Sequence, residues 1–137
     1  MKNALIFFIA GIIILLNGYI GHYFPPNGIL STPLALGISC GLIVFFTENL
    51  KILYKSLLLI VCAVFNGYLT VNYSGGIHDD EGIILIGFFL FFGSIINFVI
   101  LLLGLFFTGK EETWKEKLLA ICLYPISMLI YFQMQIA

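Results

Sequence analysis

Five long apolar runs, separated by short stretches of charged and turn residues, constrain the fold of this chain more than any other feature. Most of the runs are close to the ~20 residues that an α-helix needs to cross a bilayer. They are continuous rather than alternating, which favours helices over the strands of a membrane barrel. Only 9% of the residues are charged, whereas a soluble domain carries about 25%. The sequence therefore predicts an all-α transmembrane fold, a bundle of about five membrane-spanning helices.

The predicted spans form a single polytopic membrane domain over residues 1–137. They are expected at roughly 4–23, 33–50, 52–73, 83–108 and 117–136. Thr32 and Pro33 mark the start of the second span, because a threonine hydroxyl caps free N–H groups and proline suits the first helical position. Residues 113–116, TWKE, match a capping box, in which Thr113 and Glu116 each satisfy a backbone donor. This box should begin the fifth helix.

The lysines determine the predicted orientation. All six basic residues are lysines, and five alternating spans place them on the side of the N-terminus: Lys2, Lys51, Lys55, Lys110, Lys115 and Lys117. Positive residues flank membrane spans on the cytoplasmic side. We therefore expect the N-terminus inside, the C-terminus outside, and a location in the plasma membrane, which is the inner membrane in a bacterium. The first span resembles a signal peptide, but NGYIGHYFPP follows it without a small-residue cleavage site, so we expect an uncleaved span.

Histidine and acidic residues gather in the loop before the fourth span. His78, Asp79, Asp80 and Glu81 follow one another there, on the side opposite the lysines. We interpret them as a solvated loop whose acids cap a helix, because the macrodipole and free N–H groups favour negative charge at that end. The alternative joins His22 to His78, Asp79 and Asp80 as a cluster for a divalent transition metal. Neither histidine has a ligand partner at helical spacing, so we predict no metal and no cofactor.

Neutral polar and small residues occupy the interior of the spans. The absence of ionisable residues there argues against a proton-coupled transporter. Helix packing is expected to depend on Asn17, Gly37, Gly41, Asn66 and Asn97. Buried amides in lipid usually pair across helices, and a GxxxG such as Gly37 and Gly41 lets a second backbone approach. That GxxxG can pack within the bundle, the more frequent case, or against another subunit.

Two further features concern the shape of the bundle. Pro125 should kink the fifth helix, because it removes the hydrogen bond to the Ile121 carbonyl. The triplet Asn-Gly-Tyr at 17–19 recurs at 66–68. A parallel duplication of a helical hairpin, as in some transporters, would explain this repeat, and so would chance in such a biased composition.

No enzyme motif is present in the sequence. It lacks a glycine-rich nucleotide loop, a P-loop, a nucleophile elbow and a zinc-protease pattern. The absence of arginine also counts against catalysis on lipid phosphates or nucleotides. A membrane enzyme would have only the outer cluster of histidine and aspartate to use, so we predict that the chain is not an enzyme and binds no nucleic acid.

The remaining hypotheses are two kinds of membrane protein. The first acts by helix–helix association, as an accessory subunit of a membrane complex or as an immunity-type protein against a membrane-acting toxin. The second is a small oligomeric channel or transporter for an ion or small solute. The expected partners are the lipid bilayer and either another membrane protein or a second copy of the chain.

Overall fold

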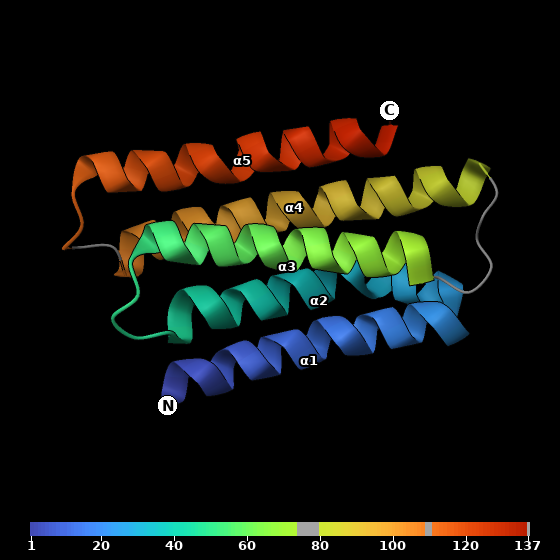
Figure 1. Cartoon of the computed structure of the whole chain (residues 1–137), viewed down its shortest axis with the longest axis horizontal. Helices are drawn as coiled ribbons and strands as arrows, with labels where there is room; N and C mark the ends of the chain where they lie inside the picture. Colours follow the sequence, from blue (N-terminus) through green and yellow to red (C-terminus); the bar gives the residue numbers. More distant parts are fainter. Residues whose placement is uncertain (74–79, 109–110, 137) are drawn as a thin grey trace.

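Over the residues that it describes, the computed structural model is a bundle of five helices in which neighbours along the chain run in opposite directions (Figure 1). It describes residues 1–73, 80–108 and 111–136. The helices are α1 (Lys2–Tyr23), α2 (Pro25–Phe46), α3 (Ile52–Tyr73), α4 (Asp80–Thr108) and α5 (Trp114–Ile136). All five are long and apolar enough to cross a membrane, which confirms the predicted all-α fold with five potential spans. The N-terminus and the end of α5 lie at opposite ends of the bundle (Figure 1).

The hydrophobic core draws on all five helices. Among its most deeply buried side chains are Ala10, Leu36, Val44, Leu59, Leu101 and Tyr124. Helix α3 is central, since it contacts each of the other four described helices, whereas α5 contacts only α3 and α4. Helix α5 therefore lies on one flank of the bundle, and most of its surface faces outward.

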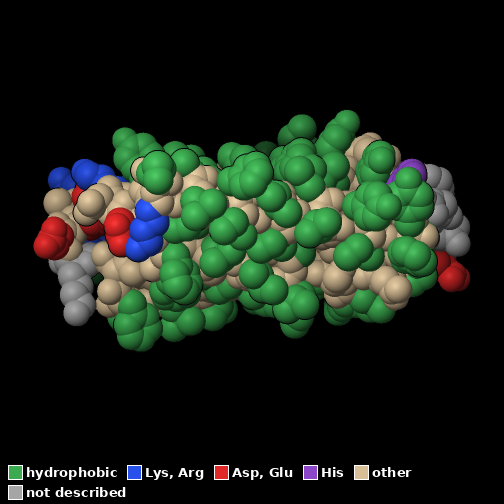
Figure 2. Space-filling model, turned by 90° about the horizontal axis from the view of Figure 1, so that it is seen from below, with side chains coloured by type: hydrophobic (Ala, Val, Ile, Leu, Met, Phe, Trp, Pro, Cys, Tyr) green, Lys and Arg blue, Asp and Glu red, His purple; other side chains and the backbone are tan. Residues whose placement is uncertain are grey.

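Charged side chains lie at the two ends of the bundle, and large apolar side chains cover the surface between them (Figure 2). Lys2 begins α1, Lys51 and Lys55 lie at the start of α3, and Lys115 and Lys117 lie in the first turn of α5. The described lysines therefore share one end, which we call the lysine end. An apolar belt with charged ends suits a protein whose solvent is lipid.

The start of α2 differs from the prediction. Pro25 and Pro26 occupy its first turn, where the missing N–H groups have no intrahelical partner to lose. Pro33, the predicted first residue, lies inside the helix. Thr32 does not cap it, because the Thr32 hydroxyl donates to the Gly28 carbonyl one turn earlier, at 2.9 Å. The predicted boundary is wrong because the proline pair upstream already begins the helix.

The other helix boundaries are closer to the prediction. Helix α3 has the predicted bounds of 52–73, while α2 ends at Phe46, short of residue 50. Helix α5 begins at Trp114, earlier than the predicted residue 117. The capping box is confirmed, because Glu116 N donates to Thr113 Oγ1 at 3.4 Å and Thr113 N donates to Glu116 Oε2 at 3.2 Å.

A single residue, Phe24, connects α1 to α2. Next to this connection the two helices approach closely at Gly21 and Gly28. A Cβ atom added to Gly28 would collide with the Gly21 backbone. The hairpin therefore depends on a glycine at residue 28, since no side chain fits there.

Candidate functional site

Four polar side chains form a hydrogen-bonded group between α1, α2 and α3, which we call the amide cluster. Asn17 Nδ2 donates to Thr32 Oγ1 and to Asn66 Oδ1, both at 3.2 Å. Asn17 Oδ1 accepts a hydrogen bond from Ser31 Oγ at 2.6 Å. Asn17, Thr32 and Asn66 are buried. In an apolar bundle, such bonds hold the three helices in register, and two of the predicted packing residues, Asn17 and Asn66, take part.

The two copies of the Asn-Gly-Tyr triplet meet at the amide cluster. Asn17 and Asn66 are the equivalent residues of the repeat, and they bond to one another. Gly18 of the first copy packs against Leu69, just after the second copy. Helices α1 and α3 run in the same direction, so the repeated residues face each other across the contact (Figure 1). The recurrence of asparagine thus has a physical reason, whatever its origin.

Asn97 lies apart from the amide cluster, beside α5. It is fully buried, and neither polar atom of its amide has a hydrogen-bond partner among the described residues. The Tyr124 hydroxyl of α5 is also buried. It lies close enough to Asn97 and Ser94 to interact with both, but it forms no well-aligned hydrogen bond with either. Buried polar groups are usually satisfied. The contact between α4 and α5 therefore contains a buried polar group, Asn97, Tyr124 and Ser94, whose hydrogen bonds to one another are poorly aligned.

Pro125 lies inside α5, next to this polar group. It lines a small apolar groove between α4 and α5, of about 190 Å³, together with Phe91, Phe98 and Met128. The kink expected at Pro125 stays a prediction.

Gly37, the first glycine of the GxxxG, lines a groove between α2 and α4, which we call the α2–α4 groove. It measures about 530 Å³ and is lined by Leu30, Pro33, Leu34, Gly37, Ile38, Phe89, Phe92, Ile96 and Ile100. Gly37 packs against Ile96, but a Cβ atom at Gly41 would meet nothing within 4 Å. Gly41 lies one turn after Gly37 on the same helix face. The close approach that this GxxxG permits is therefore not used at Gly41 by another described helix.

Other glycines make the close contacts within the bundle. A Cβ atom at Gly93 would press against Leu36, and one at Gly104 would press against Val44. Both contacts lie between α2 and α4. The sequence pattern did not reveal them, because neither glycine belongs to a GxxxG.

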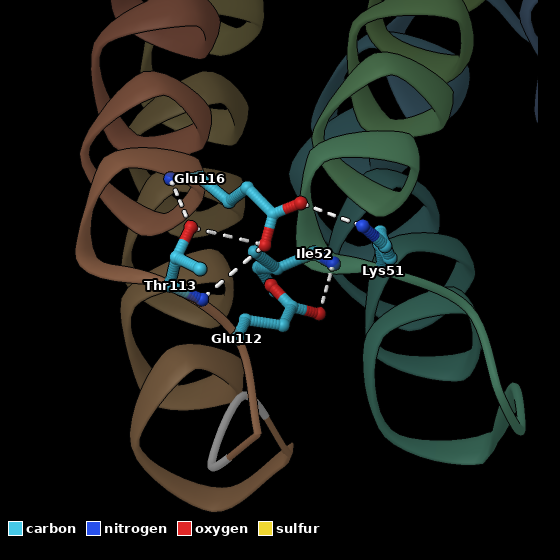
Figure 3. Close-up of polar contacts among 5 residues, drawn as sticks. All are labelled: Lys51, Ile52, Glu112, Thr113 and Glu116. Carbon is cyan, nitrogen blue, oxygen red and sulfur yellow. Dashed lines mark hydrogen bonds and ion pairs between the residues drawn. The ribbon is translucent and has the colours of Figure 1, made fainter.

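A polar cleft of about 670 Å³ opens at the lysine end. It is lined by Thr47, Asn49, Leu50, Lys51, Lys55, Phe107, Thr108, Glu111, Glu112, Thr113 and Glu116. Lys51 Nζ donates to Glu116 Oε1 at 2.6 Å, and the Ile52 backbone N donates to Glu112 Oε1 at 2.7 Å (Figure 3). The bond to Glu116 raises the pKa of Lys51, so this ammonium stays charged. An ion pair and a cap thus join the starts of α3 and α5.

Lys55 is the buried charge of the cleft. Its residue is only 2% exposed, and its Nζ donates to the Val44 carbonyl at 2.7 Å and to the Thr47 carbonyl at 3.5 Å. These carbonyls lie at the end of α2, where the negative end of the macrodipole favours a cation. No carboxylate among the described residues forms an ion pair with Lys55. Lys55 therefore caps α2 without a direct ion pair, and Glu112 is a carboxylate near enough to act on it through its charge.

Sequence reasoning missed this cleft. It treated Lys51 and Lys55 only as markers of orientation, although their spacing places them on one helix face. Glu112 and Glu116 have the same spacing in a segment predicted to lie on the same side of the membrane. A lysine pair and a glutamate pair at the same spacing on one predicted side of the membrane could therefore have indicated a charged site.

The predicted outer cluster is only partly within the described chain, since His78 and Asp79 lie outside it. Asp80 is the first residue of α4. His22 Nδ1 lies 2.9 Å from the Tyr73 carbonyl oxygen, and the two rings stack with centroids 4.3 Å apart. His22 thus joins α1 to α3. Among residues 1–73, 80–108 and 111–136, no three His, Cys, Asp or Glu side chains are grouped where they could hold a metal ion.

Five apolar helices with charged ends are the architecture of a multi-pass membrane protein. No protein-family model, curated protein or solved structure matches the chain. The functional argument therefore rests on the residues and their contacts.

Proposed function

We propose that this chain is a non-enzymatic, multi-pass membrane protein that acts by helix–helix association, as an accessory subunit of a membrane complex. The α2–α4 groove is the observation that supports this proposal most. An immunity-type protein is the special case in which the partner is a membrane-acting toxin.

The partner is best described as a transmembrane helix of another membrane protein. In lipid, helices associate through close packing rather than through the hydrophobic effect, so positions that let backbones approach are favoured. Gly41 is such a position, because no atom of the described chain fills the space where its side chain would lie. The side chains that line the groove are all apolar. A transmembrane helix with a continuous apolar face therefore suits it.

The proposed orientation places the lysine end in the cytoplasm of the cell and the end of α5 outside, with the protein in the plasma membrane. The reason is the positive-inside rule, applied to lysines that share one end of the bundle. Reporter fusions after Lys55 and after Lys117 should read cytoplasmic, and a fusion after Ala137 should read external. An internal C-terminus would overturn this orientation.

The association itself is tested by replacing Gly41 with leucine. Gly41 lies one turn beyond Gly37 on the same face of α2, so the added side chain would project next to the groove and obstruct a helix seated along it. This should weaken association by about tenfold or more, since overfilling a packed contact costs about 1–3 kcal/mol. The measurement is the mass of the complex and its subunit composition after purification in mild detergent. Gly11→Leu is the matched control, because a Cβ atom at Gly11 also meets nothing within 4 Å but lies on α1.

Wild type and Gly11→Leu should retain the same second polypeptide at a fixed ratio, and Gly41→Leu should lose it while keeping wild-type thermal stability. A complex of unchanged mass in Gly41→Leu would show that the groove is not the interface.

A second function, an oligomeric channel or transporter, is supported by a different observation. Asn97 and the Tyr124 hydroxyl are buried polar groups near the middle of the helices that form no well-aligned hydrogen bonds, and polar groups in membranes often belong to solute paths. A symmetric homo-oligomer in the same purification, together with ion or solute flux in liposomes, would favour this function over association with another protein.

A further inference from the structure

We propose that the polar cleft at the lysine end binds the headgroup of a phospholipid that carries a primary amine, with Lys55 and Lys51 on the phosphate and Glu112 on the ammonium. This inference does not depend on the α2–α4 groove. The groove is apolar, whereas this site uses charged and polar residues at the ends of the helices.

The place of the cleft suits a lipid headgroup. It lies where α2 ends and where α3 and α5 begin. In a bilayer the ends of apolar spans lie at the level of the headgroups. Trp114, beside the cleft-lining Thr113, is 75% exposed, as expected for an indole at the membrane surface. The volume of about 670 Å³ is within the usual range of ligand pockets. A lipid can therefore enter the cleft from the side, with its chains along the bundle.

The lysines provide the phosphate half of the site. Lys55 donates to two carbonyls, and an ammonium has three donors, so one remains for a ligand. Its charge is buried without a direct ion pair to a described carboxylate, and Glu112 attracts it only at longer range. A phosphate oxygen would supply a direct counter-charge. Lys51 lies one turn earlier on the same face of the chain and adds a second ammonium at the rim.

The carboxylates provide the amine half. Glu112 uses only one of its two oxygens, since Oε1 accepts the Ile52 N–H and Oε2 is buried without a partner among the described residues. Glu111 also lines the cleft, and neither residue forms an ion pair with a described lysine. Carboxylates outnumber lysines in the lining, so a phosphate alone would be repelled. A phosphate joined to an ammonium balances the charge, and a primary amine also brings N–H donors, which choline lacks.

The test uses the whole chain, purified in a non-ionic detergent and stripped of lipid. Trp114 is the single tryptophan, so its fluorescence reports on the cleft. Phosphatidylethanolamine should bind saturably, about tenfold more tightly than phosphatidylcholine or phosphatidylglycerol with the same acyl chains, because only it offers both charges and N–H donors. Free phosphoethanolamine should compete only at much higher concentration. Equal affinity for the three lipids, or for lipid and free headgroup, would overturn the proposal.

Two substitutions locate the binding. Glu112→Gln should weaken phosphatidylethanolamine binding by about tenfold and leave phosphatidylcholine binding as it was, because Glu112 contacts only the amine. Lys55→Gln should weaken both lipids, because both carry the phosphate. Glu112→Gln keeps an oxygen for the Ile52 N–H, so it preserves the cap of α3 and remains informative even if Lys55→Gln does not fold. Lys115→Gln is the control, since Lys115 is exposed at the same end but does not line the cleft. Wild-type affinity in Glu112→Gln, or an equal loss in Lys115→Gln, would contradict the assignment.

Discussion

Replacing Gly28 with alanine is expected to destabilise the hairpin of α1 and α2, at a cost of about 1–3 kcal/mol in the free energy of unfolding. The added methyl group would collide with the Gly21 backbone, and a backbone cannot turn away as a flexible side chain can. The single-residue connection at Phe24 leaves the two helices little freedom to separate. Thermal or denaturant unfolding in detergent measures the effect.

Gly21→Ala is the matched control from the other side of the same contact. A Cβ atom at Gly21 would lie 3.8 Å from the Gly28 Cα atom, which is ordinary van der Waals contact. Alanine also has a higher helix propensity than glycine. Gly21→Ala should therefore keep or slightly raise stability. Equal losses in both variants, or none in Gly28→Ala, would show that the helices do not cross in this way.

Replacing Asn17 with leucine is expected to cost about 2 kcal/mol, because it removes three hydrogen bonds and each is worth roughly 0.6 kcal/mol in a membrane protein. Thr32, Ser31 and Asn66 would all lose this partner at once. Leucine has a similar size, so the loss reports on hydrogen bonding more than on volume. The free energy of unfolding in detergent is the quantity to measure.

Asn72→Leu is the control for this change. Asn72 is exposed, and its amide donates only to the Tyr68 carbonyl of its own helix, at 3.0 Å. A surface substitution of this kind should change stability by no more than about 0.5 kcal/mol. If Asn17→Leu were as mild as Asn72→Leu, the amide cluster would not hold the three helices together.

The number and type of the helices could be predicted from the sequence because the residues that form each helix are adjacent in the chain. Continuous apolar runs determine where a chain crosses lipid, and α3 shows this best, since its bounds match the prediction. The capping box at Thr113 was also predictable, since its partners are three residues apart. Both are local features.

The start of α2 could not be predicted in this way. Pro25 and Pro33 are both plausible first residues of a helix. The choice of Pro25 requires a connection of one residue, which only the close crossing at Gly21 and Gly28 permits. That crossing is a contact between two helices, and the pattern of either helix alone does not reveal it.

The candidate sites show the same limit. The sequence indicated that Asn17 and Asn66 should be buried and paired, but not that they pair with each other. It did not show that Gly41 faces away from the other described helices. The polar cleft could not be predicted from the sequence because its lining comes from the ends of several helices. Only the packed bundle brings Lys55 and Glu112 together.

A photo-crosslinking residue at Leu34 tests the proposed association most directly. Leu34 lines the α2–α4 groove and is 66% exposed, and Phe8 on α1 is also 66% exposed but lines none of the grooves described above. In native membranes, crosslinker at residue 34 should give one adduct with another membrane protein, which Gly41→Leu abolishes, while crosslinker at residue 8 should give none. The same adduct from both positions, or an adduct at residue 34 only with lipid or with a second copy of the chain, would contradict the proposed function.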